Sequence, residues 1–210
     1  ACLSLDRRLR RVALADRGVI VGKCNPMAPP RMPGDLPEID IQNAERIDIR
    51  VLGDEWETAA LAVWNMTGST LDGQVILSEF VSSYGKTKVP GWDVVQVRTA
   101  PLFKLLTGRR KRDPLPRLQE GDLFRVPAGE NELLWLTFKT RGLAPGRYTA
   151  TLTVRALDDR VKHEVKVMLR VYPLRLGAEG RPRLNGWAST LRGKTAEEKL
   201  AHYRDYYMNV

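Results

Sequence analysis

The clearest pattern of apolar and polar positions runs from residue 126 to residue 174. In the segment 148–156, apolar residues occupy every second position, and threonines and one arginine lie between them. This period of two predicts a strand with one buried and one exposed face. The alternation returns in 161–171 after the acidic turn at Asp158 and Asp159, so the two segments are predicted to form an antiparallel hairpin.

A third strand is predicted just ahead of this hairpin. Residues 132–140 are apolar on both faces, which is typical of a central strand covered on both sides. Ala144, Pro145 and Gly146 then predict the turn into the hairpin. A sheet with one dry face needs a second layer to cover that face.

Shorter apolar segments with turn signals between them fill the first half of the chain. Before residue 126, strands are predicted at 18–21, 47–51, 58–64, 73–82 and 94–99, with a proline-rich irregular stretch after the first. In 73–82 the alternation sets Val75 and Leu77 against Ile76, Ser78 and Phe80. About eight strands are expected before Leu176, and the predicted fold class is mainly β, an immunoglobulin-like antiparallel β-sandwich.

The pattern changes after Leu176. Residues 177–183 carry glycine, proline and arginine and are predicted to form a linker, and 184–189 follows as a short strand. The expected organisation is therefore a sandwich domain over 1–176, the linker, and the opening of a second domain over 184–210.

A helix start is predicted within that last segment. Thr195 and Glu198 have the spacing of a capping box, in which the threonine caps the helix and the glutamate reaches back. Leu200, Tyr203 and Tyr207 then recur at helical spacing. A helix that packs back on the sandwich is the alternative to a second domain.

The distribution of charge and the length of the apolar runs indicate whether the chain binds nucleic acid or crosses a membrane. The net charge of +9 suggests nucleic acid, but basic residues are spread along the chain among acids. Two dense basic clusters, 7–11 and 109–112, lack interleaved aromatics, and the second is predicted to be an exposed loop tip. We therefore expect no nucleic-acid partner. Apolar runs such as 133–136 are too short to cross a bilayer, so no membrane span is expected.

Few residues carry recognisable cofactor chemistry. Cys2 and Cys24 match no zinc or haem spacing, and both a disulfide between them and two separate thiols stay open. Asp54, Glu55 and Glu57 form an acidic turn without the regular ligand spacing of a calcium loop. No phosphate loop, nucleophile elbow or zinc signature occurs, so neither a cofactor nor a metal is expected.

Three further residues have a motif or a titratable group but no clear role. Asn65 begins an N-glycosylation sequon that ends at Thr67, and such triplets also arise by chance. His163 and His202 have no serine or cysteine partner at a recognisable spacing, so we interpret both as structural or exposed.

Tryptophans supply the other candidate chemistry, because indole rings pack well against sugar rings. Trp64 and Trp135 lie inside apolar strands and are predicted to be core residues. Trp56, between Glu55 and Glu57, is a further candidate for such a sugar-stacking platform. Trp92 follows Pro90 and Gly91 in a predicted loop and is the best exposed candidate for contact with a sugar.

Four groups of residues form recognisable motifs along the chain. They are Gly53-Asp54-Glu55-Trp56-Glu57-Thr58-Ala59-Ala60-Leu61 with Val63-Trp64-Asn65, then Val126-Pro127-Ala128-Gly129-Glu130-Asn131 with Trp135, then Ala144-Pro145-Gly146-Arg147-Tyr148-Thr149, and the strand end Tyr172-Pro173-Leu174. These motifs resemble, in the same order, the amino-terminal sandwich of the glycoside hydrolase family 123 type, the β-N-acetylgalactosaminidase-like group, and the resemblance covers 47–210.

The resemblance implies that 184–210 is the first strand and helix of a truncated (β/α)₈ barrel, whose active site gathers at the carboxyl ends of its strands. The family's catalytic acid pair would lie beyond Val210, so no catalytic residue is carried over, and this fragment is not expected to be active alone. Asn185 and Trp187, near the end of the first barrel strand, are the candidates for contact with a sugar, together with Trp92, and an ordinary packing role is the alternative for Asn185 and Trp187.

The expected function is therefore that of a non-catalytic accessory sandwich, which supports the barrel and helps to wall a glycan cleft. The parent protein would be an exported glycoside hydrolase, periplasmic or extracellular, with carbohydrate as its partner. The alternative is a stand-alone extracellular sandwich that binds carbohydrate or assembles into a surface structure. The length of the parent reading frame discriminates between the two, and the sequence leaves the sugar, the linkage and the oligomeric state open.

Overall fold

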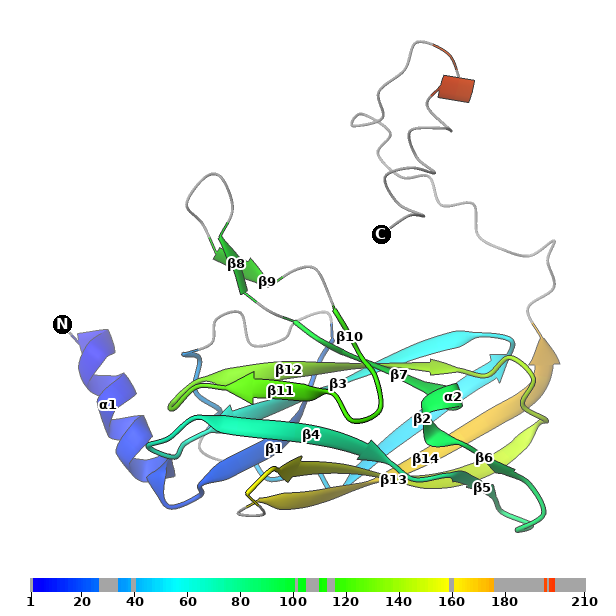
Figure 1. The fold of residues 1–210 in the computed structure, drawn as a ribbon, viewed down its shortest axis with the longest axis horizontal. Helices are drawn as coiled ribbons and strands as arrows, with labels where there is room; N and C mark the ends of the chain where they lie inside the picture. The colour runs from blue at the N-terminus through cyan, green and yellow to red at the C-terminus, as the bar shows by residue number, and fades with distance from the viewer. Residues whose placement is uncertain are drawn as a thin grey trace. The chain divides into compact units, whose positions relative to one another are not determined.

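Two compact units make up the chain, residues 1–176 and residues 177–210. The computed structural model describes residues 2–26, 34–38, 41–100, 102–104, 110–112, 116–158, 161–175, 195 and 197–198 (Figure 1). Within these residues, no helix is long and apolar enough to span a bilayer.

One sheet of the first unit has five strands, and every neighbouring pair in it is antiparallel. Its strands, in spatial order, are β1 (Val19–Cys24), β3 (Trp56–Asn65), β12 (Asn131–Lys139), β7 (Val95–Thr99) and β10 (Arg117–Leu118). Strand β12 lies at the centre, as its two apolar faces predict, because both of its faces are covered along much of its length.

The other sheet has seven strands and contains the predicted hairpin. Its main path runs β11 (Leu123–Val126), β4 (Leu71–Leu77), β13 (Gly146–Ala156), β14 (Lys162–Arg175) and β2 (Arg46–Gly53), while β5 (Phe80–Ser82) pairs with β13 and with β6 (Lys88–Val89). Strand β2 runs parallel to β14, and the register shifts after Tyr172. Pro173 lies at this irregularity, where a residue without an N–H cannot donate to the ladder.

Three smaller features complete the described part of the first unit. Helix α1 (Cys2–Ala15) precedes β1, helix α2 (Gly91–Val94) precedes β7, and β8 (Leu102–Lys104) forms a two-stranded hairpin with β9 (Arg110–Arg112). The sequence pattern did not predict α1. The basic cluster predicted as a loop tip falls instead mainly in strand β9, so that prediction was wrong in its secondary structure.

The main hydrophobic core lies between the two sheets, which form two layers (Figure 1). Val63 and Leu136 of the five-stranded sheet contribute to it, and so do Leu152 and Val167 of the seven-stranded sheet. The predicted mainly β fold is confirmed, and the layers give a sandwich-like arrangement. Burial of both inner faces is the main favourable contribution to its stability.

The predicted strand 73–82 is two strands, β4 and β5, because the chain breaks at Ser78 and Glu79. The Ser78 hydroxyl accepts the Thr151 N–H at 2.8 Å, and the Ser78 N–H donates to the Thr151 carbonyl at 3.0 Å. This break shifts the alternation, so Phe80 is fully buried in the core instead of facing away from Leu77. The predicted face of Phe80 was wrong.

The acidic turn 54–55 carries the chain from one sheet to the other. Asp54 has a positive φ of 64°, a conformation that aspartate tolerates better than most residues. The Glu55 carboxylate accepts the Leu52 N–H at 2.8 Å, and the Thr140 hydroxyl donates to the Leu52 carbonyl at 2.9 Å. The turn is thus tied to the end of β12 by hydrogen bonds.

The predicted capping box is confirmed in the second unit. The Glu198 N–H donates to the Thr195 hydroxyl at 3.1 Å, and the Thr195 N–H donates to the Glu198 carboxylate at 3.2 Å. These two reciprocal bonds satisfy donors that the first turn of a helix leaves unpaired. The predicted linker, strand and apolar stripe lie outside the described residues.

Candidate ligand-binding face

The outer face of the five-stranded sheet carries different kinds of side chain in its two halves. Strand alternation sends Leu61 and Val63 of β3 into the main core, and it sends Ala60, Ala62 and Trp64 to the outside. The same alternation holds in β12, where Leu134 and Leu136 point inward. This outer face is therefore made from alternate residues of β1, β3, β12, β7 and β10.

One half of this face, at the end nearer α1, is a second hydrophobic cluster. Ile20, Ala62 and Trp64 are buried there against Leu14 of α1. The Trp64 ring lies over Gly22, where an added Cβ would come within 2.9 Å of the ring. The Trp64 indole N–H also donates to the Asp35 carbonyl at 2.9 Å, so the prediction that Trp64 is a core residue is confirmed.

The other half, which we call the open half, carries aromatic, cationic and hydroxyl side chains. Trp135 lies directly opposite Arg98 of β7, and Arg98 lies directly opposite Arg117 of β10. The open half consists of Trp56 and Thr58 of β3, Trp135, Thr137 and Lys139 of β12, Gln96 and Arg98 of β7, and Arg117 of β10. None of these eight described positions is acidic, and three of them, Arg98, Arg117 and Lys139, are basic.

Trp56 is the most exposed tryptophan of the described residues, with 65% of its surface accessible. The Lys139 ammonium lies 5.4 Å from the centre of its ring, within the range of a cation–π contact. Lys139 is also the cross-strand partner of Trp56. The sequence favoured Trp92 over Trp56 as the exposed candidate, because the exposure of Trp56 depends on its outward position at the first residue of a strand.

Trp135 is only partly buried and packs against Ala60, Ala100 and Leu133 on the outer side of the sheet. The prediction that Trp135 is a core residue is therefore confirmed only in part, because the ring is partly buried but lies outside the main core. Trp135 and Lys139 are four residues apart on β12, so Trp135 and Trp56 lie about 14 Å apart along the strands. Two indole rings at that spacing can contact more than one ring of a chain-like ligand.

Trp92, the predicted sugar contact, lies in helix α2 and not in a loop. It is partly buried and packs against the main core, so the structure does not bring it together with the tryptophans of the open half. Asn185 and Trp187 lie outside the described residues. Contact of these three residues with a sugar stays a prediction.

Two polar residues with sequence motifs have structural roles. The Asn65 side chain is fully buried and makes hydrogen bonds to Ser69, Val126 and Thr67, so the sequon asparagine is part of the fold. His163 is half-buried, and its Nε2 lies 2.9 Å from the Ala44 carbonyl oxygen. His202 lies outside the described residues.

The cysteines and the acidic side chains were also considered as metal or disulfide sites in the sequence, and their positions are as follows. Among the described residues, no three or more histidine, cysteine or acidic side chains gather in a way that could hold a metal ion. Cys24 is half-buried and is the cross-strand partner of Ala60, at the covered edge of the face. The Cys2 side chain lies outside the described residues, so a bridge between the two cysteines stays a prediction.

No protein-family model matches the chain, and no curated protein matches it by sequence. Among solved structures, it is similar to a family 123 glycoside hydrolase from Clostridium perfringens that acts in glycolipid glycan hydrolysis, with 12% identity and a TM-score of 0.53, over 75% of this chain and 27% of that one. It is also similar to CfaE, the adhesive subunit of the CFA/I fimbria of enterotoxigenic Escherichia coli, with 12% identity and a TM-score of 0.37, over 60% of this chain and 46% of that one. The CooA pilin subunit of the same organism gives 14% identity and a TM-score of 0.35, over 74% of this chain and 99% of that one. The first match shows a distant resemblance of fold, and this chain spans little more than a quarter of the hydrolase.

Proposed function

We propose that this chain is the non-catalytic sandwich of a glycoside hydrolase-like protein, and that it supports a catalytic body and holds glycan on its open half. The observation that supports this most is the likeness to the family 123 hydrolase, which extends over 75% of the chain. Motifs in the order expected for the family's sandwich add to it.

The chemistry of the open half favours binding over hydrolysis. Most glycosidases use a pair of carboxylic acids, and the eight described positions of this face carry none. Exposed Trp56, partly buried Trp135 and nearby hydroxyl and guanidinium groups instead offer stacking and hydrogen bonds. A face of this kind retains a sugar without cleaving it.

The proposal includes a second body that begins after the sandwich. In it, 184–210 is the first strand and helix of a (β/α)₈ barrel, and Asn185 and Trp187 lie near its glycan cleft. The capping box at Thr195 supports the start of a helix there. An exported protein, periplasmic or extracellular, is the natural setting for a glycan substrate outside the cell.

Hydrolysis assays test this proposal. The purified 210-residue chain and the product of the complete natural gene are each incubated with N-acetylhexosaminide substrates, including a glycolipid glycan. We expect turnover only by the complete product. Turnover by the 210-residue chain, or a complete product that neither hydrolyses nor binds any glycan, contradicts the proposal.

A stand-alone surface module is the second candidate, and the edge strand β2 favours it. Among the described strands, β2 pairs only with β14, so one of its edges is open to another strand. Light scattering of the purified chain discriminates between the candidates. Growth of the assembly with protein concentration favours the surface module, and a constant monomer mass favours the accessory sandwich.

A further inference from the structure

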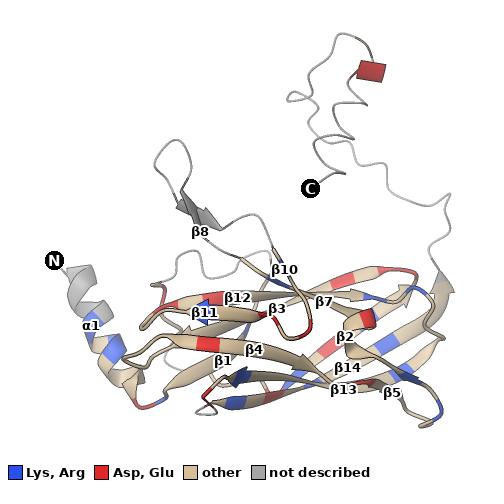
Figure 2. Cartoon of the chain, viewed as in Figure 1, with Lys and Arg blue, Asp and Glu red and all other residues tan. Residues whose placement is uncertain are grey.

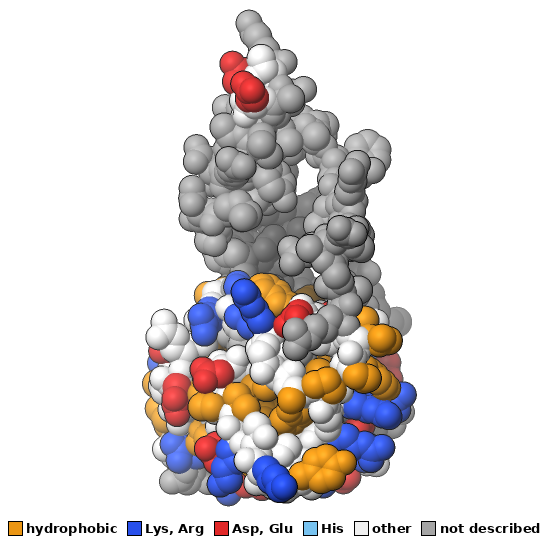
Figure 3. All heavy atoms as spheres, turned by 90° about the vertical axis from the view of Figure 1, so that its right-hand side faces the viewer, with side chains coloured by type: hydrophobic (Ala, Val, Ile, Leu, Met, Phe, Trp, Pro, Cys, Tyr) orange, Lys and Arg blue, Asp and Glu red, His pale blue; other side chains and the backbone are white. Residues whose placement is uncertain are grey.

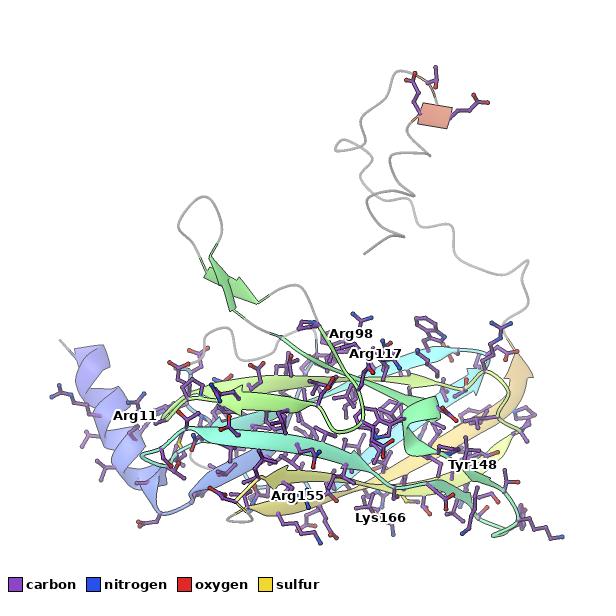
Figure 4. The ribbon with its side chains drawn as sticks, in the orientation of Figure 1. Arg11, Arg98, Arg117, Tyr148, Arg155 and Lys166 are labelled. Carbon is purple, nitrogen blue, oxygen red and sulfur yellow. The ribbon has the colours of Figure 1, made fainter. Side chains whose placement is uncertain are left out.

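We infer that the outer face of the seven-stranded sheet binds a sulfate or phosphate ester group through three arginines, Arg50 of β2, Arg170 of β14 and Arg147 of β13. We call these three residues the arginine row. Figure 4 shows Lys166, four residues before Arg170 on the same face of β14, on the side of the sandwich away from Arg98 of the open half. The row therefore lies on another sheet, and the inference goes beyond the proposed function.

The register of three neighbouring strands brings the row together. Arg170 lies directly opposite Arg50 in a parallel pair and directly opposite Arg147 in an antiparallel pair. The two neighbours of Arg170 along β14 are buried in the main core, so strand alternation sends Arg170 outward. All three arginines are exposed. Because neighbouring strands are about 5 Å apart, the row spans about 10 Å.

Two contacts help to hold the row in place. The guanidinium carbon of Arg170 lies 4.7 Å from the centre of the Tyr172 ring, within the range of a cation–π contact. Tyr148, which follows Arg147, is buried, and its hydroxyl donates to the Ala144 carbonyl at 2.8 Å. This bond fixes the start of β13, and with it the outward position of Arg147.

The charge of the row is not neutralised within the described part of the chain, where none of the three arginines makes an ion pair. Asp48 lies two residues before Arg50 on the same face of β2. The pKa of its carboxyl is lowered mainly by a hydrogen bond from Arg46, and the charge of Arg50 contributes least. Like charges directly opposite each other destabilise a sheet, and a bound anion reduces this repulsion.

A sulfate or phosphate ester fits the row better than a carboxylate does. Its three terminal oxygens can each accept from a different guanidinium, whereas a single arginine already satisfies both oxygens of a carboxylate. The body of such a ligand has apolar surface beside the row. Tyr172 and its cross-strand partner Leu52 are partly buried there, and Leu174 is 67% exposed. Figure 3 shows hydrophobic side chains among lysines and arginines at this end of the sandwich.

A nucleic acid is the other ligand that combines phosphates with rings. A single strand needs positive charge that follows its backbone. Figure 2 shows lysines and arginines on β13 and β14 toward the end where β14 finishes. One step back along the same face, however, the three positions are Asp48, Met168 and Thr149, and none of them is basic. The row therefore suits one oxyanion group better than a chain of phosphates.

Arg125 of β11 provides a matched control. It is also an exposed arginine on the outer face of the seven-stranded sheet, but its Nε donates to the Asp72 carboxylate at 2.7 Å. A response to charge alone would change in the same way when either Arg125 or Arg170 is replaced. A response that depends on the row would change only with Arg170.

NMR titration of the chain tests the inference with three probes that share one sugar: N-acetylglucosamine 6-sulfate, N-acetylglucosamine 6-phosphate and neutral N-acetylglucosamine. The natural chain is compared with Arg170→Gln, which removes the central charge of the row, and with Arg125→Gln. Melting temperatures confirm that both variants are folded. The first two probes distinguish a sulfate ester from a phosphate ester.

We expect the better of the two esters to bind about tenfold more tightly than the neutral sugar, and Arg170→Gln to remove most of that difference. Added sodium chloride should weaken only the binding of the esters, and Arg125→Gln should bind like the natural chain. Equal binding of esters and neutral sugar, or ester binding that survives Arg170→Gln, overturns the inference.

A single-stranded oligonucleotide is titrated in parallel. If it binds more tightly than both esters and loses its affinity in Arg170→Gln, the row is a nucleic-acid site and the inference is wrong. None of these outcomes changes the hydrolysis assay, so the proposed function is judged separately.

Discussion

Asn65 connects three segments of the sandwich through one buried side chain. Its amide nitrogen donates to the Ser69 carbonyl at 2.8 Å and to the Val126 carbonyl at 2.9 Å, and its side-chain oxygen accepts the Thr67 hydroxyl at 2.6 Å. Its backbone N–H donates to the Glu130 carbonyl at 2.9 Å. A buried amide with these partners holds the end of β3 to the loops on both sides.

Replacement of Asn65 should lower the free energy of unfolding. Asn65→Ala removes the buried hydrogen bond to the Val126 carbonyl and the acceptor of the Thr67 N–H and hydroxyl, so we expect a loss of about 2–4 kcal/mol in the free energy of unfolding, measured by urea denaturation. Gln119→Ala, at an exposed position, is the control and should change it by less than about 0.5 kcal/mol. An Asn65→Ala variant as stable as the control contradicts this account of the network.

Glu164 supports a prediction about pH. A hydrogen bond from Lys162, and then the charge of that lysine, lower the pKa of the Glu164 carboxyl. The Lys162 Nζ lies 2.7 Å from the Glu164 Oε1. Because the pKa is lower in the folded chain, the pair stabilises the fold above the ordinary range of glutamate. That contribution is lost as the pH falls through the lowered pKa. Both side chains are exposed, so the effect is small and is screened by salt.

Lys162→Met should raise the pKa of Glu164 toward its ordinary value, as followed by NMR titration of the side-chain carboxyl carbon. Lys88→Met, which removes the partner of Glu79, is the matched control and should leave Glu164 unchanged. An unchanged titration of Glu164 in Lys162→Met would show that the pair is absent in solution.

At the scale of whole elements, the sequence predicts best those strands whose burial is one-sided or complete. The hairpin β13–β14 could be predicted because its alternation matches a sheet that is dry on one side, and β12 because it is covered on both. Helix α1 was missed because few of its described positions are buried: Leu14 is, while Leu9 and Val12 are exposed. A helix that buries so little of its surface leaves a weak apolar pattern.

Relations between distant segments could not be predicted in the same way. Strands β2 and β3 follow each other in the chain but lie in different sheets, and β2 pairs with β14 at the other end of the sandwich sequence. The open half depends on such pairings, because Arg98, Arg117 and Trp135 come from three strands. Alternation places each residue on a face, but only cross-strand register brings the three together.

The capping box is the element for which the sequence predicted individual hydrogen bonds. Thr195→Ala removes the hydroxyl that accepts the Glu198 N–H. The cap stabilises the start of the helix by about 1 kcal/mol, so its loss should raise the hydrogen-exchange rate of the Glu198 N–H about fivefold. Thr195→Ser keeps the hydroxyl and should exchange like the natural chain. Equal exchange in the alanine and serine variants would contradict the predicted cap.

For the first unit as a whole, the inner faces of the two sheets supply stability, and the outer face of the five-stranded sheet is where we propose that a glycan binds. The end of the sandwich where β14 finishes shows hydrophobic side chains among lysines and arginines (Figure 3). Because Trp56 is exposed and the core is closed without it, its surface is available to a ligand at little cost in stability.

The most direct test of the central claim, that the open half holds glycan, is NMR of the tryptophan indole N–H signals during titration with chitotetraose, a neutral oligosaccharide of N-acetylglucosamine. The account predicts that the Trp56 and Trp135 signals shift together and saturate. The Trp64 signal should not move, because its indole N–H is bonded to Asp35 in the covered half. Signals of Trp56 and Trp135 that stay fixed while the glycan binds, or a shift confined to Trp92, would contradict the account.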